Sequence, residues 1–392
     1  MTPRSISILG ATGSIGASTL DLIRRNRGQW RVVALTANAN VAELARLARE
    51  FSAEVAVVAD EAKLPELREA LAGTRIEAAG GEGALIEAAA RAANLTIAAI
   101  VGCAGLAPTM AAIEQGGIVA LANKEALVSA GEVMTAAVAR HGATLLPIDS
   151  EHNAIFQCLC GNDPAHVRSI TLTASGGPFR EWSWQQLTVA TPAQAVKHPN
   201  WDMGAKISVD SATMFNKGLE LIEAHHLFPV GLDRLRIIVH PQSVVHSMVE
   251  YRDGSTLAQL GPSDMRVPIA SALAWPARMD TPCEPLDLAR IGELTFRAPD
   301  EERFPATRLA REAAEAGGAI PAVLNAANEI AVAAFLGGQI AFTRIAAQVA
   351  DVLSAYAPPP PTCLSDVLAV DGEARMRARE LLAKKPSGEC LT

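Results

Sequence analysis

The stretch "SISILGATGSIGASTLDLIRR", residues 5–25, decides the fold expected for the N-terminal part of the chain. It begins as an apolar strand, turns at glycines, and continues as a helical pattern of Leu and Ile. Gly10, Gly13 and Gly16 let the backbone turn tightly and approach a pyrophosphate, which binds the N–H groups at a helix start. A tight turn with close helix packing is the alternative, but the position after a first strand favours a dinucleotide site.

Further strands follow at short intervals along the chain. They read "RVVALT", "EVAVVAD", "LTIAAIVG", "GIVALAN" and "ATLLPID", and Ala- and Leu-rich helical stretches separate them. Alternating strands and helices form βαβ units, in which helices cover both faces of a parallel sheet. Residues 1–149 are therefore predicted to form an α/β domain with a Rossmann-like, doubly wound parallel sheet that binds a dinucleotide.

The pattern changes near residue 150. Strands are expected at "SITLTASG", "AKISVDS" and "LRIIVH", and "VVHSMVEYRDGSTLAQL" alternates around Asp253-Gly254, which is a two-residue hairpin signal. We therefore expect an α+β catalytic domain over 150–285 and a Pro-containing linker over 286–310. Ala-rich helical patterns predict a helical C-terminal domain over 311–385, with "APPPPT" at 357–362 as an extended connector. Residues 386–392 are expected to be a disordered tail.

Composition limits the class of protein. A length of 392 residues exceeds the usual limit for one core, and 49% hydrophobic content is typical of a folded protein. A net charge of −8 argues against nucleic-acid or membrane-surface partners, which favour basic stretches. The longest apolar run, Leu95 to Pro108, is shorter than the roughly 20 residues that span a bilayer. The six cysteines have no framework spacing, and the N-terminus lacks the layout of a signal peptide, so we expect a cytoplasmic protein.

The second strand indicates which dinucleotide binds. "RVVALTANAN" ends without the Asp or Glu that would bind a ribose 2′-hydroxyl, so NADP is favoured over NAD. Asn38 and Asn40 are the candidates to meet a 2′-phosphate. In "ALANKEALVSAG", Asn123, Lys124 and Glu125 follow another parallel strand, where the ligands of open α/β sheets bind. For Lys124 a solvated lysine at a helix start is the alternative.

"LLPIDSEHNAIF", residues 145–156, places Asp149, Ser150, Glu151 and His152 in succession after a buried strand. Residues i and i+2 of an extended segment share a side, so Asp149 and Glu151 are expected to converge on one point. Two converging carboxylates repel each other unless a cation lies between them, which predicts a site for a hard metal ion. A helix N-cap at Asp149 or Ser150 is the alternative interpretation.

Polar residues gather in "GAKISVDSATMFNKGLELIEAHHLF", expected to run from a strand into a helix. The polar side of that helix, opposite its apolar side, carries Asn216, Lys217 and Glu220. These residues are interpreted as a binding site, and a plain surface ion pair between Lys217 and Glu220 is the alternative. Gly218 in mid-helix indicates that another group approaches closely. Hydroxyl, amide and ammonium groups are the donors of a phosphate pocket, which is predicted at Ser175, Ser211, Asn216 and Lys217. A loop that closes over the ligand is predicted at His198 and Trp201.

Taken together, these motifs resemble the family of 1-deoxy-D-xylulose 5-phosphate reductoisomerases over nearly the whole chain. The stretches that carry the resemblance are "GATGSIG", "ALANKEALVSAG", "PIDSEHNAIFQ", "TASGGPF", "HPNWDMGAKISVDSATMFNKGLELIEA", "HPQSVVHSMVEYRDGS" and "LAQLGPSDMR". The resemblance implies a V-shaped three-domain fold and a homodimer joined through the central domain. It also implies conversion of 1-deoxy-D-xylulose 5-phosphate to 2-C-methyl-D-erythritol 4-phosphate with NADPH and Mg²⁺ or Mn²⁺.

The resemblance also implies roles for individual residues. The metal ligands would be Asp149, Glu151 and Glu220, and with Lys124 they would form the catalytic set. The other substrate contacts would be Ser150, Ser175, His198, Trp201, Ser211, Asn216 and Lys217, and the cofactor positions would be Gly10, Thr12, Gly13, Ser14, Ile15, Asn38, Asn40, Asn123 and Glu125. Where the family usually has Gly-Lys/Arg-Asn, this chain has Asn38-Ala39-Asn40, which lowers the expected preference for NADPH.

Two other functions are compatible with parts of the sequence. A phosphorylating semialdehyde dehydrogenase also opens with "GATG" and would use Cys103 as its nucleophile, although the neighbours of Cys103 are apolar. A non-enzymatic, dinucleotide-sensing regulator would use the glycine turn and the helical C-terminus, but it would not need a cluster of acids.

Overall fold

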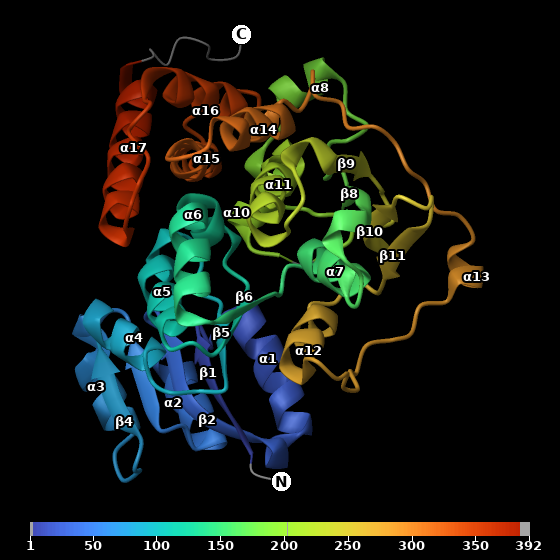
Figure 1. Ribbon diagram of the computed structural model, residues 1–392. Helices are drawn as coiled ribbons and strands as arrows, with labels where there is room; N and C mark the ends of the chain where they lie inside the picture. The colour runs from blue at the N-terminus through green and yellow to red at the C-terminus, as the bar shows by residue number, and fades with distance from the viewer. Residues whose placement is uncertain (1–2, 202, 385–392) are drawn as a thin grey trace. The chain divides into compact units, whose positions relative to one another are not determined.

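The computed structural model describes residues 3–201 and 203–384 of the chain (Figure 1). The tail predicted at 386–392 lies outside these described residues. The described chain divides into two compact units, and the three-domain boundaries expected from the sequence stay a prediction. The first unit comprises the described parts of Met1–Ala126, Met134–Asn153 and Asp264–Glu284, and the second those of Leu127–Val133, Ala154–Ser263 and Pro285–Thr392.

A parallel sheet forms the centre of the first unit. Within the described residues it has seven strands in the order β4-β3-β2-β1-β5-β6-β7. The order reverses beside β1, which confirms the predicted doubly wound sheet. The strands are β1 (Arg4–Leu9), β2 (Trp30–Ala37), β3 (Val55–Val58), β4 (Glu77–Gly80), β5 (Leu95–Ala98), β6 (Ile118–Leu121) and β7 (Thr144–Pro147). The sequence did not predict β4, an edge strand whose small residues, "EAAG", carry no β-branched signal.

Amphipathic helices cover this sheet. They are α1 (Ser14–Arg25), α2 (Val41–Phe51), α3 (Leu64–Ala70), α4 (Glu82–Ala89), α5 (Leu106–Glu114), α6 (Lys124–His141) and α12 (Arg266–Ala274). In α2 the residues Val41, Leu44 and Leu47 face the core at helical spacing, and the side chain of Asn40 caps the first turn. Helix α12 packs beside α1 although it is distant in sequence (Figure 1).

The second unit is built around a mixed sheet. Its described residues form four strands in the order β11-β10-β8-β9: β8 (Val167–Ala174), β9 (Leu235–Val239), β10 (Val245–Tyr251) and β11 (Thr256–Leu260). Strands β8 and β9 are parallel, whereas β10 is antiparallel to both β8 and β11. The hairpin predicted at Asp253-Gly254 is therefore confirmed. Its loop runs from Arg252 to Ser255, longer than the predicted two residues, and Gly254 supplies a φ of 92° there.

The strand predicted at "AKISVDS" is wrong, because these residues form helix α10 (Ala205–Thr213). The β-branched Ile207 and Val209 alternate as in a strand, yet the buried residues follow helical spacing. Buried hydroxyls are tolerated because Ser208 Oγ donates to the carbonyl of Gly204 at 3.0 Å and Thr213 Oγ1 to that of Val209 at 3.0 Å. Met214, which has a φ of 68°, is the C-cap of α10, and α11 (Phe215–Leu227) follows directly.

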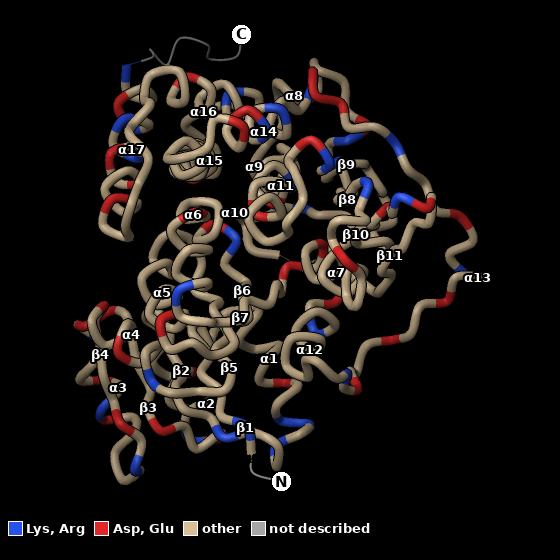
Figure 2. The backbone as a smooth tube through the Cα atoms, viewed as in Figure 1, with Lys and Arg blue, Asp and Glu red and all other residues tan. Residues whose placement is uncertain are grey.

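Helices complete the second unit and confirm the helical C-terminal part. They are α7 (Ser150–Leu159), which begins in the first unit, α8 (Trp184–Thr188), α9 (Pro192–Ala195), α13 (Leu288–Ile291), α14 (Ala306–Ala316), α15 (Ile320–Leu336), α16 (Arg344–Ala355) and α17 (Leu364–Lys384). Gly218 of α11 does mark a close approach, since a Cβ there would lie 2.7 Å from the Cβ of Ala310 in α14. "APPPPT" connects α16 to α17 without regular structure, and α17 carries both acidic and basic residues (Figure 2).

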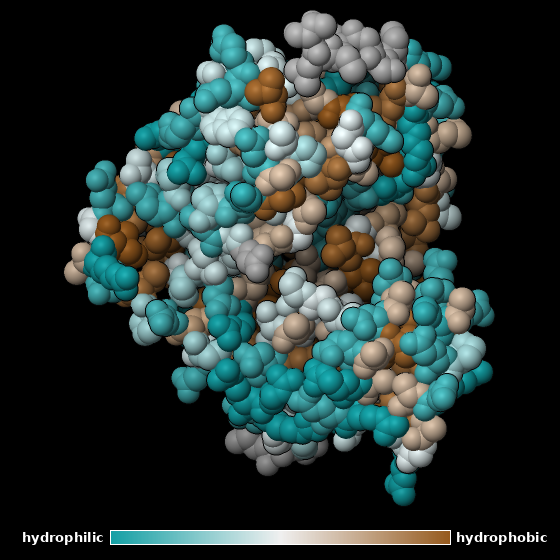
Figure 3. Space-filling view, turned by 180° about the vertical axis from the view of Figure 1, so that it is seen from behind, coloured by the Kyte–Doolittle hydropathy of each residue, from teal (hydrophilic) through white to brown (hydrophobic). Residues whose placement is uncertain are grey.

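The described surface combines polar and apolar side chains. Figure 3 shows teal and brown residues interspersed on the face that it presents. None of the helices in the described parts of the chain combines the length and apolar character needed to cross a membrane.

The second unit contains a half-buried histidine, His226, that makes stability depend on pH. A Cβ on Gly131 of α6 would lie 2.2 Å from His226 Nε2, so the His226 ring packs directly against helix backbone. Burial, followed by the charge of His225, lowers the pKa of His226 to about 4. An unfolded histidine titrates near 6.5, at about its ordinary value.

We predict that acid destabilises the protein through this histidine. Between about pH 6.5 and pH 4 the unfolded chain binds the extra proton, so stability falls as pH falls through this window. Between pH 7 and pH 5 wild type should lose about 2 kcal/mol more unfolding free energy than His226→Gln. Urea denaturation at both pH values measures this difference, with the exposed His141→Gln as the control. Equal losses in wild type and His226→Gln would contradict the prediction.

Candidate active site

The glycine turn of the first unit lies between β1 and α1. Gly10 has a φ of 89°, and a Cβ there would lie 2.6 Å from the carbonyl oxygen of Ala99, just after β5. A Cβ on Gly16 would lie 2.5 Å from the carbonyl oxygen of Gly10. Gly13 is different, because it is exposed and its Cβ would meet only this same oxygen at 3.4 Å. Gly10 and Gly16 are therefore required by the turn itself, whereas Gly13 faces open space.

The N-terminus of α1 is suited to an anion. Gly13 is its N-cap, no side chain caps the helix, and its first turn contains no acidic residue. Free N–H groups and the positive end of the helix dipole therefore remain for a ligand. Of the other residues predicted here, Ser14 is exposed, and Thr12 and Ile15 are half-buried.

The remaining cofactor positions follow β2 and β6. Asn38 and Asn40 are exposed after β2, and Asn40 also caps α2 by accepting from the N–H of Glu43 at 3.2 Å. Asn123 is buried at the start of α6. It donates to the carbonyl of Gly102 at 2.9 Å and accepts from the N–H of Ala126 at 3.1 Å, so it connects α6 to the loop after β5.

A buried ion pair lies at the carboxyl ends of β6 and β7. Lys124, at the first position of α6, places Nζ 2.6 Å from Oδ2 of Asp149. The side chain of Lys124 is 7% exposed and that of Asp149 is 11% exposed. The interpretation of Lys124 as a solvated lysine is therefore wrong. Its ammonium compensates a carboxylate that would be costly to bury alone.

The segment after β7 forms a helix cap as well as a cluster of acids. Helix α7 begins at Ser150, and Oδ1 of Asp149 accepts from the N–H of Glu151 at 3.2 Å. The extended geometry expected for Asp149 and Glu151 is therefore wrong, because Glu151 belongs to the first turn of α7. Ser150 Oγ donates to Oε2 of Glu151 at 2.6 Å. Capping uses one carboxylate oxygen of Asp149, and Lys124 lies beside the other.

Helix α11 of the second unit presents the predicted amide, ammonium and carboxylate together. Asn216 Nδ2 donates to Oε1 of Glu220 at 2.6 Å, and Lys217 Nζ donates to Oε2. Lys217 is 3% exposed and Glu220 is fully buried, so the interpretation as a plain surface ion pair is wrong. A carboxylate with one donor on each oxygen is held in a fixed orientation.

Ser175 and His198 form a second polar group in the same unit. His198 Nδ1 accepts from the N–H groups of Asn200 at 3.2 Å and Trp201 at 3.0 Å, so in the neutral ring the proton resides on Nε2. His198 Nε2 therefore donates to Ser175 Oγ, 2.8 Å away, which also accepts from the N–H of Gly177 at 3.1 Å. With both acceptor positions used, the hydroxyl proton of Ser175 is directed towards a further acceptor, as a phosphate site requires.

Ser211 completes the set of predicted phosphate residues. It lies half-buried on α10. A Cβ on Gly177, which has a φ of 68°, would lie 2.7 Å from the carbonyl oxygen of Ser211. The loop that carries Ser175 therefore packs directly on the backbone of α10 beside Ser211.

Two residues bear on interpretations made from the sequence. His152 was given no role, yet it is fully buried with Nδ1 3.6 Å from Oδ1 of Asp149. Only knowledge that α7 begins at Ser150 would have revealed this i, i+3 pair. Cys103, the nucleophile required by the dehydrogenase alternative, is half-buried at the start of a short 3₁₀ turn, Cys103–Gly105.

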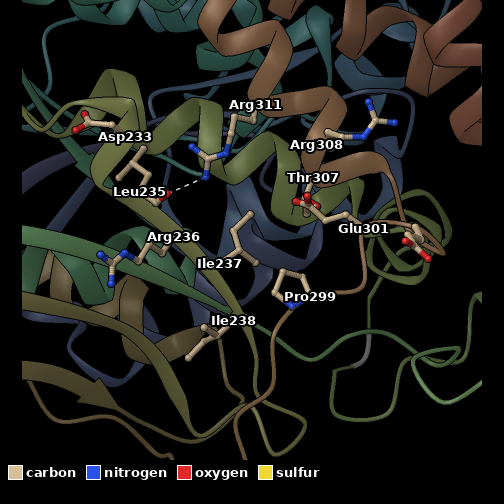
Figure 4. A pocket seen from close by; sticks show the side chains of 11 residues that line it. Asp233, Leu235, Arg236, Ile237, Ile238, Pro299, Glu301, Thr307, Arg308 and Arg311 are labelled. Carbon is tan, nitrogen blue, oxygen red and sulfur yellow. Dashed lines mark hydrogen bonds between the residues drawn. The ribbon is translucent and has the colours of Figure 1, made fainter.

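A separate hollow of about 730 Å³ lies between β9 and α14 in the second unit (Figure 4). Arg236, Arg308 and Arg311 line it together with acidic and apolar residues. Arg311 donates to the carbonyl of Leu235 at 2.8 Å, as the dashed line in Figure 4 shows. None of the predicted site residues lines this hollow.

Family models and relatives cover nearly the whole chain. A model described as 1-deoxy-D-xylulose 5-phosphate reductoisomerase matches residues 6–131, and two models of its C-terminal domains match residues 145–228 and 260–377. The chain is similar to the reductoisomerase of Zymomonas mobilis, with 58% identity over 98% of this chain and 99% of the relative. The one from Afipia carboxidovorans is 56% identical over 97% and 94%.

Solved structures agree with these relatives. The Zymomonas mobilis reductoisomerase in complex with NADPH matches with a TM-score of 0.94 and 57% identity, covering 98% of this chain and 100% of that one. A DOX-P reductoisomerase in complex with NADPH, fosmidomycin and magnesium matches with a TM-score of 0.91 and 44% identity, covering 97% and 98%. The chain therefore belongs to the 1-deoxy-D-xylulose 5-phosphate reductoisomerase family.

Proposed function

We propose that this protein converts 1-deoxy-D-xylulose 5-phosphate to 2-C-methyl-D-erythritol 4-phosphate with NADPH and a divalent metal ion. One observation carries the proposal: the first unit places the glycine turn and the buried Lys124–Asp149 pair at the carboxyl ends of strands in one sheet. Ligands of doubly wound sheets bind at this edge. In the proposed reaction the carbon skeleton rearranges by retro-aldol cleavage and re-addition, and the resulting aldehyde is then reduced.

The cofactor would bind along the glycine turn. The N–H groups at the start of α1 would bind its pyrophosphate, and exposed Gly13 leaves room for the backbone to approach it. Asn38 and Asn40 would face the adenosine end after β2. Gly10, Thr12, Ser14, Ile15, Asn123 and Glu125 complete the proposed set of cofactor positions. NADPH supplies the hydride that reduces the aldehyde.

We propose Asp149 and Glu151 of the first unit and Glu220 of the second as ligands of one Mg²⁺ or Mn²⁺ ion. The fit follows from the donor set, because carboxylate oxygens suit these hard ions and Cys or His ligands would favour zinc. A bound ion would polarise neighbouring substrate oxygens and stabilise the negative charge that develops on them. Lys124, already beside Asp149, would add a fixed positive charge at the same place.

The phosphate group of the substrate would bind to the second unit. Ser175 directs its hydroxyl proton outward, and Ser211, Asn216, Lys217 and His198 would provide the other donors. Trp201, whose N–H donates to His198, and Ser150 would complete the substrate contacts. A grip on the phosphate, away from the reacting carbons, supplies binding energy that orients those carbons.

We also propose a homodimer joined through the second unit. Strand β11 is an edge strand and carries the exposed Leu257. An apolar side chain on an open sheet edge is suited to pairing with a second copy. Light scattering should give the mass of a dimer for wild type and a lower mass for Leu257→Arg, whereas a monomeric wild type would contradict the proposal.

The cysteines, which lack framework spacing, support a reducing compartment such as the cytoplasm.

We predict that the three proposed metal ligands determine the metal requirement. Replacing a carboxylate by its amide keeps the size but removes one charge from the ion's surroundings, so Asp149→Asn, Glu151→Gln and Glu220→Gln should each need at least about tenfold more Mn²⁺. NADPH absorbance loss with 1-deoxy-D-xylulose 5-phosphate, with and without metal, measures turnover, and equilibrium dialysis measures bound Mn²⁺.

The matched control for these variants is Glu223→Gln, a buried acid on the same helix as Glu220. It should retain the wild-type metal requirement. Unchanged Mn²⁺ binding in all three ligand variants would remove the metal assignment, and absence of turnover in metal-loaded wild type would remove the proposed reaction.

We predict that Gly13 is needed by the cofactor and not by the fold. A Cβ at Gly13 meets only the carbonyl oxygen of Gly10, at an ordinary contact distance of 3.4 Å, so Gly13→Val should melt near wild type while its NADPH dissociation constant rises at least about tenfold. Gly16→Ala is the contrasting variant, because its Cβ would lie 2.5 Å from backbone and should destabilise the fold. Fluorescence titration with NADPH measures the affinity. A folded Gly13→Val protein with unchanged affinity would contradict the assignment.

A further inference from the structure

A buried hydrogen bond connects the C-terminal helices to α10. Asn328 of α15 is fully buried, and its Nδ2 donates to Oδ1 of Asp210 at 2.8 Å. Asp210 is 1% exposed, and Lys206 Nζ lies 2.8 Å from its other oxygen, Oδ2. The carboxylate is thus held from one side by its own helix and from the other by α15.

Asp210 lies directly before Ser211, one of the proposed phosphate residues. On the opposite side, α10 contacts the loop at Gly177, where a Cβ would lie 2.8 Å from the Cα of Ala212. That loop carries Ser175, which bonds to His198. Because these contacts are between backbone atoms, a shift of α10 by a few tenths of an ångström has to move the loop too. The position of α10 therefore determines where both Ser211 and the Ser175 loop lie within the second unit.

Packing alone does not explain an asparagine at position 328. A leucine of similar size would fill the same buried space without a polar group to desolvate. Within the described residues, Oδ1 of Asn328 is buried and has no hydrogen-bond partner, which is costly. The contact that Asn328 does make is with a buried carboxylate one residue from the proposed site. The polar side chain is therefore explained by its bond to Asp210.

We propose that Asn328 is a positioning residue for the phosphate end of the substrate. It fixes the carboxylate of Asp210, which fixes α10, and α10 holds Ser211 and the Ser175 loop in the arrangement that binds phosphate. The inference rests on the proposed function in its choice of phosphate residues. It adds a role for the C-terminal helices, which contribute no predicted ligand to the site.

The test compares two buried amides. Asn328→Leu removes the donor to Asp210, and Gln348→Leu is the matched control. Gln348 is also fully buried, and its Nε2 donates to the carbonyl of Ala378 at 3.0 Å, between α16 and α17. Four quantities are measured for each protein: KM and kcat for the sugar phosphate, the dissociation constant for inorganic phosphate, and the dissociation constant for NADPH.

For Asn328→Leu we expect KM and the dissociation constant for inorganic phosphate to rise about tenfold. This factor corresponds to the free energy lost with a hydrogen bond to a charged group. The NADPH constant should stay unchanged and kcat should change less than KM. Hydrogen exchange should accelerate in α10 and in the Ser175 loop. Gln348→Leu should leave all of these at wild-type values even if it lowers the melting temperature equally.

Equal phosphate constants and equal exchange in α10 for the two variants would overturn the inference. If Asn328→Leu fails to fold, Asn328→Ser, which shortens the donor, is measured against Gln348→Ser by the same criteria. Phosphate binding and exchange need no turnover. A wild type that binds phosphate but does not convert the sugar phosphate would therefore refute the proposed reaction while the inference is still decided by the variants.

Discussion

The carboxylates of Asp149 and Glu220 each lie beside the ammonium group of a lysine of their own unit. Lys124 lies beside Asp149, and Lys217 beside Glu220. An isolated buried carboxylate is costly, and removing one partner of a buried pair costs on the order of 3–5 kcal/mol. The positions of three helices bring each carboxylate next to its lysine. Helix α6 begins at Lys124, α7 begins directly after Asp149, and α11 carries its pair three residues apart. Each unit therefore presents a compensated and oriented carboxylate before any ligand binds.

The same pairing gives the two units different tasks in the proposed reaction. The first unit combines the start of α1, which no side chain caps, with a cation beside Asp149, as expected for a cofactor next to a reacting oxygen. The second unit provides hydroxyl, amide and imidazole groups whose protons are already directed by hydrogen bonds within the protein. A metal ion between carboxylates of both units would join these tasks. The helices behind α10 contribute through Asn328 and not through a ligand of their own.

Local features of the sequence predicted most of the first unit. β-branched runs and Gly10, Gly13 and Gly16 report directly on strands and a turn, because their causes lie within a few residues. Features that depend on distant partners were missed or misread. "AKISVDS" alternates like a strand, but the hydroxyls of Ser208 and Thr213 bond within a helix. Glu151 was placed on an extended segment because the helix cap at Asp149 or Ser150 was considered only as the alternative.

Contacts between distant parts of the chain left no pattern in the sequence. Helix α12 belongs to the first unit because it packs on α1, and the bond from Asn328 to Asp210 joins residues 118 positions apart. Local periodicity carries no signal for either contact, since each partner looks ordinary in its own segment. Charge and spacing indicated the acids after β7 and the polar side of α11, and the family resemblance implied the roles of the individual residues. Their burial, which excludes plain surface ion pairs at Lys124 and Lys217, required the structure.

The central claim is that carboxylates from both units share one divalent ion. Anomalous diffraction from crystals of the full chain grown with NADPH and Mn²⁺ tests it most directly, because the manganese signal locates the ion without reference to activity. We predict one anomalous peak bonded to carboxylate oxygens of Asp149, Glu151 and Glu220. A peak bonded to other residues, or no peak at these three acids under conditions that support turnover, would contradict the account.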